Sequence, residues 1–205
     1  MRTSFSPAFL VSLESSYCIR LKHFNYFIKE KKSKKKNPFQ ATCPVLENDA
    51  LEDMSVAYKG KKIYLCCPDE FQADPKAFAA KANFQLLQTG QIVQVACPLS
   101  GHDLDPNLNV KVNGVKIGLC CKNCKTKLDK ASESKKLELV FTSLEKGFTL
   151  QTKCPVTDKT IDPQFSLEYK KKTVYFCCKN CPAAFKKNLE KYVAKLPQFV
   201  EAKKK

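Results

Sequence analysis

Short runs of alternating apolar and polar residues, each broken by a polar turn, occur three times along the chain. They are SVAY-KGK-KIYL at 55–65, NVKV-NGV-KIGL at 109–119 and SLEY-KKK-TVYF at 166–176. Alternation with a period of two is typical of half-buried strands. Asn113-Gly114 is a strong tight-turn signal, Lys59-Gly60 a weaker one and Lys170–Lys172 weaker still. The pattern predicts three β-hairpins.

A helical period follows these runs, clearest at 177–196. Apolar residues recur there at intervals of three and four, at Phe185, Leu189, Tyr192, Val193 and Leu196. Pro182 fits the first turn of such a helix, and Pro197 is predicted to end it. Phe71 and Phe78, seven residues apart, indicate a similar helix in the segment 71–84.

The segments between these units are predicted as connecting strands. Residues 84–96 and 137–153 resemble strand pairs around turns at Thr89-Gly90 and Glu145–Gly147. The predicted fold is therefore α+β, with three small repeated modules. Each module is a β-hairpin plus a short helix around a cysteine cluster, and short β-hairpin connections join them.

Cysteines recur at one spacing in all three units, which we call the first, second and third cysteine frames. A Cys-Pro pair leads each frame, and a vicinal pair follows 23 positions later: Cys43 with Cys66-Cys67, Cys97 with Cys120-Cys121, and Cys154 with Cys177-Cys178. The second and third frames add Cys124 and Cys181 within an identical CCKNC. The predicted modules span 41–94, 95–151 and 152–200. Modules of about 55 residues usually need a staple such as a metal or a disulfide.

Thiols at this spacing indicate a metal site. Cys120 and Cys124 lie four apart, so one helix turn puts both on one face, where Cys97 can join them from the hairpin base. Cys154, Cys177 and Cys181 repeat this arrangement. An alternative uses Cys121-x-x-Cys124 and leaves Cys120 spare, and a second alternative makes the cysteines disulfides or buried apolar residues. The secondary metal candidates are Cys43, Cys66, Cys67, Cys121 and Cys178. Candidates for a fourth ligand are His102, Asp103, Asp158, Asp162 or water.

The first frame departs from this pattern, because it reads CCPDEF and lacks the third thiol. Either Glu70 stands in its place, or Phe71 matches Phe185 and three residues, including the cysteine, are deleted. A three-thiolate site would then have to use Cys67, Asp69 or Glu70. The first module is predicted to be degenerate, with a weak or empty site.

Charge and composition restrict the remaining functions. The formal net charge is +16, almost all from lysine, with Arg2 and Arg20 the only arginines. Nucleic acid is thus a less favoured partner, because arginine is the usual reader of bases and phosphates. Residues 1–40 are predicted as a non-globular basic leader, with an apolar run at 5–13 that makes a poor signal peptide, and 201–205 as a lysine-rich tail. No stretch approaches the ~18 apolar residues of a membrane span.

The cysteine motif resembles the TRASH domain and the related YHS domain. A lead cysteine, a hairpin-length gap, an apolar residue and then Cys-x3-Cys opening a short helix carry the resemblance. It implies metal ligation by Cys97, Cys120 and Cys124, and by Cys154, Cys177 and Cys181. The expected function is non-catalytic binding of a heavy metal, Zn²⁺ or Cu(I), in a carrier, sensor or structural role. The alternatives are a zinc-stabilised protein associated with nucleic acid or ribosomes and, less favoured, a thiol redox protein. With two histidines and six glycines, the chain shows no enzyme signature.

Overall fold

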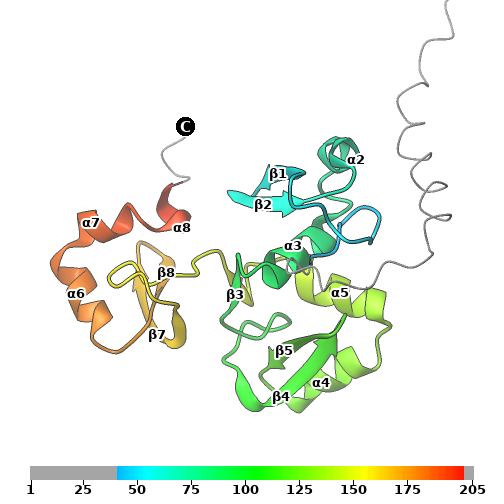
Figure 1. Ribbon diagram of the computed structural model, residues 1–205. Helices are drawn as coiled ribbons and strands as arrows, with labels where there is room; N and C mark the ends of the chain where they lie inside the picture. Colours follow the sequence, from blue (N-terminus) through cyan, green and yellow to red (C-terminus); the bar gives the residue numbers. More distant parts are fainter. Residues whose placement is uncertain (1–40, 201–205) are drawn as a thin grey trace, which may run out of the picture. The chain divides into compact units, whose positions relative to one another are not determined.

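The computed structural model describes residues 41–200, which form a mixed α+β structure of short helices and two-stranded sheets (Figure 1). The predicted leader and the lysine-rich tail lie outside these residues. Within the described part, no helix combines the length and the apolar character needed to cross a membrane.

The three predicted hairpins are confirmed. β1 (Ser55–Tyr58) pairs with β2 (Lys61–Tyr64), β4 (Asp105–Val112) with β5 (Val115–Leu119), and β7 (Asp162–Tyr169) with β8 (Lys172–Phe176), all antiparallel. Both residues of each two-residue turn have positive φ: 50° and 70° at Lys59-Gly60, 45° and 82° at Asn113-Gly114, and 49° and 61° at Lys170-Lys171. Such turns match the twist of the strands. The lysine pair is the least suited to them, which explains its weak sequence signal.

Helices begin beside the vicinal cysteines, as predicted. They are α2 (Pro68–Ala73), α4 (Lys122–Asp129) and α6 (Cys181–Lys187). The single helix expected up to Leu196 is instead divided. It breaks at Asn188, whose φ of −140° is not helical, into α6 and α7 (Leu189–Val193). Pro197 does not merely end it but begins a further short helix, α8 (Pro197–Val200).

The predicted connecting hairpins are wrong. Helix α3 (Ala79–Gln88) covers the start of the first connection, and α5 (Glu133–Phe141) covers the start of the second. Only the dipeptide strands β3 (Val93–Gln94) and β6 (Phe148–Thr149) remain, and they pair with each other. Short apolar runs fit a buried helix and a strand equally well, so the alternation there was ambiguous.

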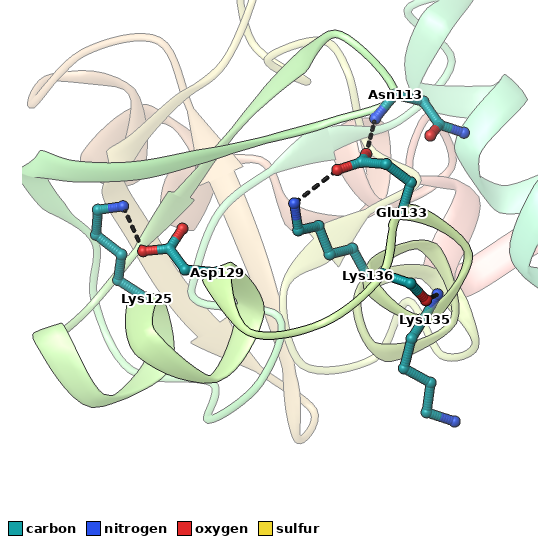
Figure 2. A network of polar contacts seen from close by, with 7 residues as sticks. Asn113, Lys125, Asp129, Glu133, Lys135 and Lys136 are labelled. Atoms are coloured by element: carbon teal, nitrogen blue, oxygen red, sulfur yellow. Dashed lines mark hydrogen bonds and ion pairs between the residues drawn. The ribbon is translucent and has the colours of Figure 1, made fainter.

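Local hydrogen bonds favour α5 as a helix. The Oγ of Ser132 accepts the N–H of Lys135 at 3.3 Å, which caps the first turn. Glu133 accepts the backbone N–H of Asn113 at 3.1 Å and pairs with Lys136 Nζ at 2.6 Å (Figure 2). The helix start is thereby attached to the turn between β4 and β5.

Two separate cores lie inside the described residues. The larger core includes buried residues from Ala41 to Phe148, and α3 packs against α5 within it. Phe84 meets Phe141 edge to face at 5.2 Å, and Asn83 Nδ2 donates to the carbonyl of Phe141 at 2.6 Å. The smaller core consists of Cys154, Val174, Phe176, Cys181, Phe185 and Leu196. The first two hairpins therefore share one core, whereas the third has its own.

Candidate metal centre

The structure brings six cysteines into two groups of three. One group is Cys97, Cys120 and Cys124, the other is Cys154, Cys177 and Cys181, and within each group the sulfurs lie within 4.8 Å of one another. The Cys120–Cys124 and Cys177–Cys181 sulfurs are each 3.7 Å apart. Tetrahedral zinc with Zn–S bonds of ~2.3 Å needs sulfurs about 3.8 Å apart. Each group could therefore hold a metal ion.

The lead cysteine of each frame is held in the same tight turn. Its carbonyl accepts the N–H of the residue four positions later, and its N–H donates to the carbonyl five positions later, at 2.7–2.9 Å in all three frames. The residue at the fourth position has positive φ: 60° at Glu47, 79° at Gly101 and 59° at Asp158. The three lead cysteines are fully buried. This turn delivers the lead sulfur to the end of the second hairpin strand, where the vicinal pair lies.

Hydrogen bonds make the lead thiol the acidic member of its group. Burial alone would raise the pKa of Cys97, but the Ser100 hydroxyl and the backbone N–H of Cys120 lower it to about 7. Thr157 and the backbone N–H of Cys177 likewise outweigh burial and lower the pKa of Cys154 to about 7. The lead thiol is thus the first of its group to lose its proton and carry the negative charge.

The thiol from the helix holds its proton more tightly. Burial and contact with its neighbouring sulfurs raise the pKa of Cys124 to about 12, and the same causes raise the pKa of Cys181. One negative charge already present on a group opposes a second. A bound cation removes this repulsion between thiolates, because its positive charge replaces the protons of all three thiols.

A hydroxyl three residues after the lead cysteine completes each group. Ser100 Oγ lies 3.2 Å from Cys120 Sγ, and Thr157 Oγ1 lies 3.0 Å from Cys177 Sγ. These two residues were not among the predicted site residues. The available signal was a hydroxyl at this position in the second and third frames, where the first frame has Leu46.

A glutamine clamps the lead turn to the hairpin in every frame. Gln94 Nε2 donates to the carbonyls of Ala96 and Gly118, at 3.1 and 2.8 Å, while its Oε1 accepts the N–H of Gly118 at 2.9 Å. Gln151 makes the same three bonds, to Lys153 and to both backbone groups of Tyr175, at 3.0, 2.6 and 3.1 Å. The clamp fixes how the lead cysteine faces the vicinal pair.

The first frame obtains this clamp from another element. Gln85 of α3 donates to the carbonyls of Thr42 and Tyr64 at 2.9 and 2.6 Å and accepts the N–H of Tyr64 at 2.8 Å. These glutamines were also missed. The signal was a glutamine three residues before every lead cysteine, at positions 40, 94 and 151. The first of these positions lies outside the described residues.

The remaining thiols of the second and third frames lie at the edge of each group. Cys178 Sγ is 3.4 Å from Cys181 Sγ, yet neither Cys178 nor Cys121 belongs to a group. Backbone N–H groups of the adjoining helix turn, led by that of Cys124, lower the pKa of Cys121. Both thiols are partly exposed.

The candidate fourth ligands divide into two pairs. His102 and Asp103 line an open hollow together with Cys120 and Cys121, so they border the second group. Asp158 instead pairs with Lys195 Nζ at 3.2 Å. Asp162 accepts the N–H of Gln164 at 3.0 Å. The carboxylates of the third frame are therefore used in other contacts.

The first frame has no group of three among residues 41–200. Cys43 Sγ and Cys66 Sγ are 3.1 Å apart, and Cys67 is disulfide-bonded. Burial, the contact with Cys43 and the nearby charge of Glu70 are among the causes that raise the pKa of Cys66 to about 12. Glu70 is close enough to act on Cys66 but takes no part in such a group.

Aromatic contacts show how the helix of the first frame corresponds to that of the third. Phe71 meets Tyr58 edge to face at 5.6 Å and lies 6.2 Å from Phe78. Phe185 makes the matching contacts, to Tyr169 at 5.8 Å and to Tyr192 at 6.2 Å. These contacts favour the alignment in which Phe71 matches Phe185 and the third cysteine is deleted.

No family model, no curated protein and no solved structure matches this chain. The resemblance to TRASH and YHS domains therefore stays an expectation drawn from the cysteine motif.

Proposed function

We propose that the chain is a non-catalytic heavy-metal-binding protein of the TRASH/YHS kind, with one ion in each three-sulfur group. The observation that carries the proposal is that two separate frames bring three sulfurs together in the same geometry. The two groups lie in different cores, so the packing of a single core does not explain why both have the same arrangement of sulfurs.

The chemistry of the ligands favours a soft or borderline ion. Sulfur is the only donor in either group, and thiolates suit Zn²⁺ and Cu(I), whereas Mg²⁺ and Ca²⁺ require oxygen. The acidic lead thiol provides a first anionic contact at neutral pH. The partly exposed cysteines beside it leave the ion accessible to exchange, which fits a carrier or sensor at least as well as a structural role.

Cobalt substitution tests the proposal directly. Reduced, metal-free protein titrated with Co²⁺ should develop intense thiolate charge-transfer bands that saturate at about two equivalents. Cys124→Ser and Cys181→Ser should each remove about one equivalent.

Cys121→Ser and Cys178→Ser are the matched controls, because they remove the neighbouring thiol outside each group. They should keep both equivalents. Absence of the bands in reduced wild-type protein would refute metal binding. Loss of metal in the controls but not in the first two variants would move ligation to the vicinal pairs.

A further inference from the structure

Cys43 and Cys66, the lead cysteine and the first vicinal cysteine of the first frame, form a pair of thiols in direct contact. Their sulfurs are 3.1 Å apart. The backbone N–H of Cys66 also points at Cys43 Sγ, at 3.3 Å. The turn of the first frame and the end of β2 thus hold two sulfurs directly against each other.

This separation suits a bond between the sulfurs better than a shared ion. Two thiolates on one tetrahedral zinc stand about 3.8 Å apart, so this pair would have to open before a metal could enter. A disulfide needs the sulfurs to approach to about 2.05 Å. The pair also lacks a third ligand among residues 41–200.

We propose that the first frame is a redox site, in which Cys43 and Cys66 form a reversible disulfide, and not a third metal site. Cys66 is partly exposed, so a small oxidant such as hydrogen peroxide can reach it, while Cys43 is fully buried behind it. The frame thus contains one thiol that can be oxidised from solvent and a second that can resolve the product. This inference concerns different residues from the proposed metal groups, and only its selectivity rests on the proposed function, through metal that protects the other thiols.

The reaction balances with peroxide as the oxidant. The S–H of Cys66 points at Cys43 Sγ, so the Cys43 thiolate takes that proton and the Cys66 sulfur attacks one peroxide oxygen. The O–O bond breaks, and the leaving hydroxide takes up a proton and departs as water, which gives a sulfenic acid at Cys66. The Cys43 sulfur then attacks the Cys66 sulfur, the S–O bond breaks, and a second water leaves. Two thiols and one H₂O₂ thus become one disulfide and two waters. The sulfurs lose two electrons, and the peroxide gains them.

The first-frame clamp favours this closure. Gln85 bonds to Thr42, next to Cys43, and to Tyr64, two residues before Cys66, so the backbones are already held together. The bond would close a loop from position 43 to 66 without requiring a new fold. In the second and third frames, bound metal would instead occupy the thiols and protect them from oxidation.

Peptide mapping of the zinc-loaded full chain tests the proposal. After brief treatment with equimolar peroxide, non-reducing digestion and mass spectrometry should find the Cys43 and Cys66 peptides linked. Alkylation of both thiols should be lost with oxidation and should return after dithiothreitol treatment. Native mass spectrometry of the same sample counts the ions, so failure of metal binding is seen separately from failure of the disulfide.

Cys66→Ser should abolish the linked peptide, and Cys67→Ser, its neighbour in the chain, should retain it. If either variant does not fold, the wild-type alkylation pattern alone decides. Peroxide that first links any of the other free cysteines, leaving aside the disulfide already formed by Cys67, would overturn the proposal. So would a third zinc ion bound in the first frame as tightly as the other two.

Discussion

Ser100 and Thr157 each donate to, or accept from, a sulfur of the vicinal pair, at 3.2 Å from Cys120 and 3.0 Å from Cys177. Residues that hydrogen-bond a metal ligand orient it and stabilise its anionic form, and removing them typically weakens metal affinity by about 10–100-fold. We expect Ser100→Ala and Thr157→Val to lower zinc affinity by about tenfold in competition with a chromophoric chelator. Ser100→Thr keeps the hydroxyl and should keep the affinity. Equal affinities in all variants would show that the hydroxyls play no part.

The lowered pKa of the lead thiol indicates how metal binding should depend on pH. With the pKa of Cys97 and Cys154 lowered to about 7, each empty group carries about one thiolate at pH 8 and almost none at pH 6. Loading three thiolates should therefore release about two protons per zinc ion at pH 8 and about three at pH 6. Apparent affinity should fall more steeply below pH 7 than above it. Proton release into weak buffer measures this directly, and an unchanged count at the two pH values would contradict it.

The thiols could be predicted from the sequence because their chemistry and their spacing are both local. The 23-residue gap matches a hairpin that returns the chain to Cys97, and a separation of four keeps Cys120 and Cys124 close. The predicted shared helix face is wrong, because α4 begins at Lys122 and only Cys124 lies on it. Gln94 and Gln151 could not be assigned in the same way. The recurrence of glutamine three residues before each lead cysteine marks their position, but their partners are backbone groups of a distant strand, which the sequence does not reveal.

At the level of elements, turn chemistry was the reliable guide. Asn113-Gly114 and Lys59-Gly60 placed their hairpins correctly because few residues accept positive φ there. Residues 84–88 of α3 and 137–141 of α5 were misassigned as strands, whereas residues 79–84 of α3 fall within the helix predicted at 71–84. Asn83 and Gln85 are buried on α3, where hydrogen bonds to distant backbone carbonyls satisfy them, so the buried face of the helix includes polar residues. A pattern based on apolar residues alone does not detect such a face.

The glutamine clamp should be a main determinant of the third hairpin's stability. Gln151→Met keeps the side-chain size but leaves the backbone N–H and C=O of Tyr175 without this partner, and an unsatisfied buried group costs about 1–3 kcal/mol. We expect the free energy of unfolding to fall by at least about 2 kcal/mol in denaturant titration of the metal-loaded protein. Gln164→Met, on an exposed position of β7, should change it by less than about 0.5 kcal/mol. Equal effects would show that the clamp contributes little.

Across residues 41–200, the two three-sulfur groups are supported by hydrophobic cores of different size. The second frame shares its core with the first hairpin, through α3, α5 and the β3–β6 pair. The third frame depends on a core with only six buried residues, two of which are cysteines of its own group. A small unit of this kind has little apolar burial to offset the entropy of folding. Its stability should therefore come mainly from the ion.

Removing the metal should consequently destabilise the smaller core while the larger core stays folded. When a strong chelator is added to the reduced, zinc-loaded protein, amide hydrogen exchange should accelerate throughout residues 154–196. Zinc ligation is worth ~10–16 kcal/mol in small domains, which exceeds the stabilisation that six buried side chains supply. Protection should persist in α3 and α5, whose contacts do not involve the ion. Cys181→Ser should reproduce the loss at 154–196 without chelator, and Cys178→Ser should not. Uniform loss of protection across residues 41–200 would mean that both cores depend on metal alike, and unchanged exchange at 154–196 would mean that the small core is stable without it.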